Sequence, residues 1–123
     1  MVEPALMMKT ALVLLTLAAL GGLTMAGIRL ARNANPPHAF AMGHGLLAGA
    51  AVTLLLYAYF TVGLPTMACW ALVLFVVAAL GGTFLNLGFH MKGLLLPKGM
   101  MIGHAAIAVV GYGLLAVTVL GGR

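Results

Sequence analysis

The sequence predicts an all-α integral membrane protein, folded as a bundle of four membrane-spanning helices. Of its 123 residues, 64% are hydrophobic and only 6% are charged, whereas a soluble domain carries roughly 25% charged residues. The mean hydropathy is +1.21. Because so few polar residues cannot cover a surface that faces water, lipid is the expected surrounding. The length allows one domain.

Four apolar stretches are each long enough to cross a bilayer as a helix, which takes about 20 residues. The connections between them are short. Pro37 and Pro97 stand where a helix begins, a position that tolerates the missing N–H. We therefore expect antiparallel neighbours in one bundle. The expected helices span about residues 5–30, 38–60, 65–89 and 99–120.

The chain consists of two tandem two-helix repeats, residues 1–62 and 63–123. An offset of 60 residues, which places Ala11 on Ala71, aligns the repeats without a gap. Two such repeats cross the membrane in the same sense, related by an axis along the membrane normal. Lys9 before an apolar run also fits a signal peptide, but the repeat favours a retained helix. The informative matches are Gly21-Gly22 with Gly81-Gly82, Pro37 with Pro97, and Gly43-His44 with Gly103-His104.

The few charged residues predict orientation in the membrane. A net charge of +5 from six basic residues is too sparse for a nucleic-acid surface. Two basic residues flank the first connection and two flank the third, so the positive-inside rule places these connections in the cytoplasm and both termini outside. We expect a multi-pass protein of the bacterial inner (cytoplasmic) membrane. The four residues are Arg29, Arg32, Lys92 and Lys98.

Each repeat places one histidine and one glycine pair at a similar depth. His44 and His104 lie about 10 Å into the span, counted from Pro37 and Pro97 at the α-helical rise. Glycines in membrane helices usually serve close packing, and a single histidine near a helix end usually makes a hydrogen bond. Two duplicated polar residues inside a membrane instead indicate one shared object. The glycines at this depth are Gly21, Gly22, Gly81 and Gly82.

The shared object can be a metal ion, a proton pathway or a haem. Zinc prefers about four ligands, and His38, about 9 Å along the helix from His44 and on another face, completes such a site poorly. A proton pathway needs carboxylates, and Glu3 is the only one. Haem iron has two axial positions, and the glycines would open a slot for the macrocycle. The residues therefore favour one haem b with its iron bound by His44 and His104.

Two more residues are candidates for contact with this haem. Arg29 follows Gly22 by two turns on the same face, where it would meet a haem propionate. His90 lies two turns beyond Gly82. At this position near the expected helix end, His90 either contacts a propionate or a quinone, or is simply solvated at the membrane interface.

In its four helices, paired histidines and flanking glycines, the chain resembles the membrane-embedded b-type cytochromes, which include haem-bearing subunits of respiratory oxidoreductases. The resemblance extends along the chain at the level of architecture and motif. It maps the family's ligand histidines onto His44 and His104 only, and it implies a haem b without a covalent link. Two-haem members usually carry a second histidine deeper in each ligand helix. The corresponding residues here are Tyr57 and Ala58, and Val117 and Thr118, which limits the expectation to one haem.

The favoured function is electron transfer in the membrane. The chain would exchange electrons with a quinone or a partner redox subunit, as part of a hetero-oligomeric complex or a homo-oligomer, with no independent catalysis. Haem supplies the redox chemistry in such proteins. One alternative is a non-catalytic membrane subunit whose histidines hold a quinone, a lipid or a neighbouring chain. A small transporter or channel is a third, because doubled repeats are common there too.

Overall fold

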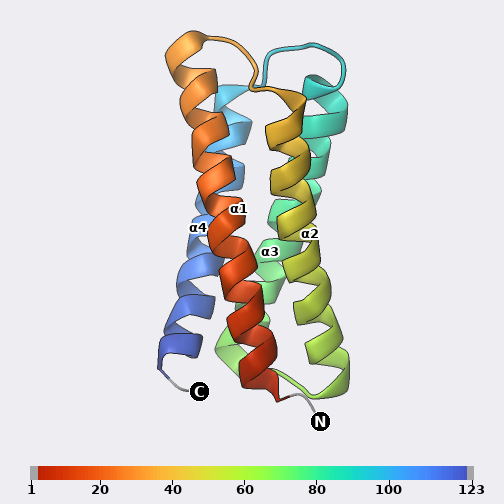
Figure 1. The fold of residues 1–123 in the computed structure, drawn as a ribbon, viewed down its shortest axis with the longest axis vertical. Coiled ribbons are helices and arrows are strands. Elements are labelled where there is room, and N and C mark those ends of the chain that lie inside the picture. Colours follow the sequence, from red (N-terminus) through yellow and green to blue (C-terminus); the bar gives the residue numbers. More distant parts are fainter. Residues whose placement is uncertain (1–2, 122–123) are drawn as a thin grey trace.

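The computed structural model describes residues 3–121 and is an antiparallel bundle of four long helices (Figure 1). This confirms the predicted all-α, four-helix architecture. Every helix, with α3 extended to His90, is long and apolar enough to cross a membrane. The elements are α1 (Pro4–Arg32), α2 (His38–Thr61), α3 (Thr66–Leu85), a π-helical turn (Asn86–His90) and α4 (Lys98–Leu120).

Prolines and left-handed residues set the ends of the helices. Pro37 and Pro97 come directly before α2 and α4, where the fixed φ of proline suits the entry to a helix and its missing N–H costs no hydrogen bond. Helix α1 ends at Asn33, whose φ of 48° is left-handed. Gly63, with a φ of 83°, reverses the chain between α2 and α3, a conformation open to a residue without a Cβ.

The two helical hairpins pack side by side. Helix α1 pairs with α2 and α3 with α4, and the hairpins meet along α1/α4 and α2/α3. Helices α2 and α4 therefore lie on opposite corners of the bundle (Figure 1). Both described ends of the chain and the α2–α3 turn lie at one end, here the terminus end. The α1–α2 and α3–α4 connections lie at the other, here the loop end.

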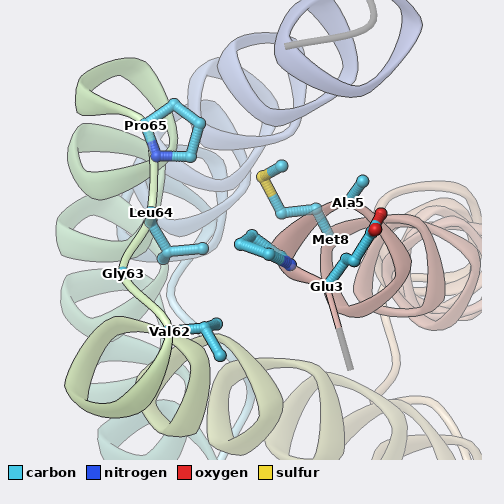
Figure 2. Close-up of a pocket in the computed structure, with 8 residues that line it drawn as sticks. Glu3, Ala5, Met8, Val62, Gly63, Leu64 and Pro65 are labelled. Carbon is cyan, nitrogen blue, oxygen red and sulfur yellow. The ribbon is translucent and has the colours of Figure 1, made fainter. Parts of the chain in front are cut away.

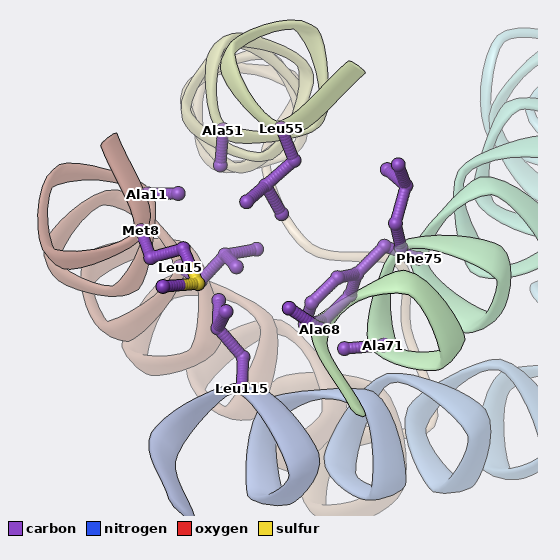
Figure 3. Close-up of a cluster of buried hydrophobic side chains, with 10 residues drawn as sticks. Met8, Ala11, Leu15, Ala51, Leu55, Ala68, Ala71, Phe75 and Leu115 are labelled. Atoms are coloured by element: carbon purple, nitrogen blue, oxygen red, sulfur yellow. The ribbon is translucent and has the colours of Figure 1, made fainter. Parts of the chain in front are cut away.

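A dry core fills the half of the bundle nearest the terminus end (Figure 3). Met8, Leu55 and Leu115 are its fully buried large side chains. Gly111 of α4 makes room for an aromatic ring of α3, because a Cβ there would lie 3.1 Å from Phe75 Cε1. Burial follows the 60-residue offset. Buried pairs are Met8 and Ala68, Ala11 and Ala71, Leu15 and Phe75, Ala18 and Ala78, Pro36 and Leu96, Ala51 and Gly111, Leu55 and Leu115, and Ala58 and Thr118.

The two contacts between the hairpins differ in polarity. On the α1/α4 side, Thr16 Oγ1 donates to the Leu12 carbonyl at 2.8 Å and also lies 2.7 Å from Tyr112 Oη. A hydroxyl has one proton, so the tyrosine is the donor to the threonine. The equivalent positions on the α2/α3 side are Val76 and Val52, and an apolar groove of about 330 Å³ lies along that side.

Large apolar side chains also cover the outside of the bundle. Phe60 is 77% exposed, Leu46 is 72% exposed and Trp70 is 63% exposed. In water such a surface is a liability for association. It matches hydrocarbon surroundings instead, as expected for a multi-pass membrane protein.

Candidate cofactor site

His44 of α2 and His104 of α4 face each other between the hairpins. Their ring centroids are 6.2 Å apart and their planes are inclined by 74°. Both residues are half-buried, in contrast to the fully buried core nearer the terminus end. Helices α2 and α4 occupy opposite corners of the bundle, so side chains that point inward from them meet between the hairpins. The two rings lie at one level because His44 and His104 have equivalent positions in the duplicated motif.

The ring of His44 is held by a backbone group of the adjacent helix. Its Nδ1 lies 2.7 Å from the carbonyl oxygen of Ala18 on α1. A carbonyl only accepts hydrogen bonds, so Nδ1 carries the proton, and Nε2 of the neutral ring keeps a free lone pair. Histidines that bind metals are commonly oriented in this way by a hydrogen bond from the other ring nitrogen.

The ring of His104 is held less completely. Its Nδ1 is buried without a hydrogen-bond partner within residues 3–121. It is the only side-chain nitrogen or oxygen in that range with this property. Among residues 3–121 the Nε2 atoms of both histidines also make no hydrogen bond, but they are not buried, so accessible space lies beside them.

Gly22 and Gly82 make room for these two rings. A Cβ at Gly22 would lie 3.0 Å from His44 Cε1, and a Cβ at Gly82 would lie 2.9 Å from His104 Cε1. The spacing of the sequence predicts glycines that line a slot for a macrocycle. In the structure an imidazole of the same hairpin packs against each of these two glycines, and the slot for a macrocycle stays a prediction. A Cβ at Gly21 would lie 3.9 Å from His44 Cβ, and a Cβ at Gly81 would lie 3.9 Å from His104 Nδ1, both at ordinary contact distance.

Arg29 and His90 bind the connections at the loop end. Arg29 is 5% exposed and donates from Nε to the Leu96 carbonyl at 2.9 Å and from Nη1 to Asn33 Oδ1 at 3.0 Å. His90 is 4% exposed and donates from Nε2 to the Pro36 carbonyl at 2.7 Å. Each side chain therefore joins its own hairpin to the connection of the other. For both residues a propionate contact stays a prediction.

The π-helical turn makes His90 the counterpart of Arg29. Their acceptors, Leu96 and Pro36, are separated by the repeat offset of 60 (96 − 36), but the donors are separated by 61 (90 − 29). The π turn holds one residue more than an α turn, and its Met91 amide donates to the Asn86 carbonyl at 2.8 Å. A gapless alignment pairs Arg29 with Phe89, so it cannot find this relation.

Asn35 completes the contact between the two connections and was not among the predicted site residues. Its Nδ2 donates to the Leu94 carbonyl at 2.7 Å, and its Oδ1 accepts from the Leu96 amide at 3.0 Å. His38, which is exposed, stacks on His90 with centroids 4.3 Å apart. We call Arg29, Asn35 and His90, with their acceptors on Leu94, Leu96 and Pro36, the loop-end clasp.

A second groove of the bundle lies away from the histidines. A groove of about 500 Å³ opens at the terminus end, between the start of α1 and the α2–α3 turn (Figure 2). Glu3 and Met8 line one side and Val62 and Leu64 line the other. This groove contains none of the predicted site residues.

The separation of the two imidazole rings matches that of two imidazoles bound to one metal ion. Two imidazoles that share a metal at a metal–nitrogen distance of about 2 Å hold their ring centres about 6 Å apart, because each nitrogen lies about 1 Å from its ring centre. The observed 6.2 Å between centroids agrees with this spacing. Within residues 3–121, no group of three or more His, Cys, Asp or Glu side chains gathers as a metal site.

The chain was compared with protein-family models, with curated proteins and with solved structures, and none of the three comparisons gave a match.

Proposed function

We propose that the chain is a membrane electron-transfer protein that binds one haem b between His44 and His104. The observation that carries the proposal is the pair of facing imidazoles, 6.2 Å apart, contributed by equivalent positions of two hairpins. Axial ligation by protein side chains is the usual way in which haem iron is held. The protonated Nδ1 of His44 leaves Nε2 free for such a bond.

Each surrounding residue has a definite part in this proposal. The Ala18 carbonyl orients the ring of His44, and the glycine pairs let α1 and α3 approach the rings closely. The bound haem supplies one-electron redox chemistry, and the protein tunes it through the ligands, their hydrogen bonds and burial.

We also propose the setting in which the protein works. The positive-inside rule, applied to the exposed Arg32, Lys92 and Lys98 of the loop end, puts that end in the cytoplasm and the termini outside a bacterial inner membrane. Electrons would pass to or from a quinone or a partner subunit of a respiratory or other redox complex. That complex is either hetero-oligomeric or a homo-oligomer of this chain.

A second candidate is a non-catalytic membrane subunit in which the histidines join helices. It is favoured by one observation: His44 packs on Gly22 and bonds to the Ala18 carbonyl, which ties α2 to α1 without any cofactor. Such contacts are common between membrane helices. While Nδ1 of His44 ties the helices together, the ring nitrogens without a partner would hold a quinone, a lipid or a neighbouring chain.

The haem content of the purified protein tests the first candidate against the second. The chain is expressed with a haem precursor, purified in detergent and assayed as the pyridine haemochrome. We expect a ratio that approaches one haem per chain, with a low-spin, six-coordinate spectrum. A chain without extractable haem favours the second candidate, and a ratio of two contradicts the single site.

Histidine variants then identify the ligands. His44→Ala and His104→Ala should each abolish the six-coordinate spectrum, leaving a five-coordinate haem or none. His38→Ala is the matched control and should keep the spectrum. If His44→Ala keeps an unaltered low-spin spectrum while His38→Ala or His90→Ala loses it, the ligands lie at the loop end and the proposed site is wrong.

A further inference from the structure

The histidine pair lies much nearer to one end of the bundle than to the other. Counted at the α-helical rise, His44 is about 9 Å from the start of α2 and about 26 Å from its end. His104 is about 9 Å from the start of α4 and about 24 Å from its end. The dry core, which includes Leu55 and Leu115, fills the longer path. An electron carrier with its cofactor at this level has its shorter route to a partner at the loop end.

The exposed charge at the loop end is entirely basic. Arg32 ends α1, Lys92 follows the π turn and Lys98 begins α4, and all three side chains are exposed. The single acidic residue of the chain, Glu3, lies at the opposite end (Figure 2). No carboxylate of this chain therefore compensates the three cations, and the surface attracts an acidic partner.

The loop-end clasp makes this surface rigid. The hydrogen bond from Arg29 to the Leu96 carbonyl and those of Asn35 fasten the two connections to each other. The buried His90 fastens the end of α3 to the first connection in the same way. A surface that is already ordered loses little conformational entropy when a partner docks.

We infer that the loop end is the docking surface for the acidic face of a soluble or peripheral redox protein, with Arg32, Lys92 and Lys98 as its attracting charges. This inference rests on the proposed electron-transfer function. A protein is favoured over a lipid headgroup because of where the cations stand. They lie at the ends of helices and in the connection between them, and this surface projects away from the bundle along its axis. Lipid surrounds the sides.

Binding to a defined probe tests the surface without depending on haem. The protein is placed in nanodiscs of phosphatidylcholine, and binding of a fluorescently labelled, acidic [2Fe–2S] ferredoxin is followed by anisotropy. We expect binding that weakens as salt rises. The double variant Lys92→Glu with Lys98→Glu should weaken it at low salt by about tenfold or more. Lys9→Glu, an exposed cation at the terminus end, is the matched control and should leave it unchanged.

The haem-loaded protein provides a kinetic measurement of the same surface. Stopped-flow reduction of the haem by reduced ferredoxin should slow by about tenfold or more in the double variant at low salt, and the variant should keep its low-spin spectrum. A basic donor, reduced cytochrome c, should bind the wild-type surface weakly and the double variant more tightly. If the double variant keeps its low-spin spectrum, its slower reduction results from weaker docking and not from a damaged haem site.

The outcomes distinguish the docking surface from the proposed function. If no haem is bound but ferredoxin binding still depends on Lys92 and Lys98, the electron-transfer proposal fails and the acidic-partner surface stands. If haem is bound but neither binding nor reduction responds to the double variant, the docking inference is wrong. If the variant leaves ferredoxin binding unchanged and instead removes phosphatidylglycerol that co-purifies with the protein from mixed nanodiscs, the cations form a lipid site and the inference is also wrong.

Discussion

Replacement of Gly22 by alanine tests the packing that defines the histidine site. The new Cβ would lie 3.0 Å from His44 Cε1, whereas ordinary carbon contacts begin at about 3.5 Å. The ring must therefore retreat by about 0.5 Å. Its Nδ1 is held 2.7 Å from the Ala18 carbonyl, so the retreat strains or breaks that hydrogen bond. Overpacking of this kind costs about 1–3 kcal/mol.

Alanine also forms helix more readily than glycine, by about 1 kcal/mol, and this gain must be separated from the packing cost. Gly27→Ala is the matched control, because Gly27 lies in the same helix and a Cβ there meets nothing within 4 Å. The gain in helix propensity is the same in both variants. The difference in their free energies of unfolding is thus the packing cost alone, about 1–3 kcal/mol.

Unfolding in mixed micelles of dodecyl maltoside and sodium dodecyl sulfate, followed by circular dichroism, measures both variants. We expect Gly27→Ala to equal or exceed the wild type in stability and Gly22→Ala to fall below Gly27→Ala. Gly82→Ala should behave like Gly22→Ala, since its Cβ would lie 2.9 Å from His104 Cε1. If Gly22→Ala is as stable as Gly27→Ala, the imidazole does not pack on the glycine and the described site geometry is wrong.

Three further predictions concern other parts of the bundle. Tyr112→Phe removes the hydroxyl that donates to Thr16 and should destabilise the protein by about 0.6 kcal/mol in the same unfolding assay; an unchanged midpoint would show that the contact contributes nothing. Arg29→Met breaks the bond to the Leu96 carbonyl and should cost about 1.5–3 kcal/mol, the range for hydrogen bonds of charged groups; a more stable variant would contradict the clasp. In a Cys69→Ala background, Ala34→Cys at the loop end should react with an impermeant maleimide only after cells are opened, and labelling of intact cells would reverse the proposed orientation.

Hydropathy and the repeat predict much of the architecture. The number of helices follows from four apolar stretches and the prolines between them, because the length of a spanning helix is a property of the local sequence. The level shared by His44 and His104 follows from the offset of 60, since equivalent residues of parallel repeats stand at equal depth. The structure brings their rings to 6.2 Å, and the haem between them stays a prediction.

The partners of the site residues depend on how the helices rotate and cross, which no local pattern records. Hydropathy cannot tell that Gly22 receives the ring of His44, or that Tyr112 finds Thr16 across the bundle. The π turn has no sequence signal here, yet it advances the following residue by one position and makes His90 rather than Phe89 the counterpart of Arg29. The sequence by itself thus determined the helices and the equivalent positions of the two histidines along them, because both depend on apolar length and spacing along one chain. Only the tertiary structure decided which polar atoms meet, because side-chain contacts depend on the relative rotation of separate helices.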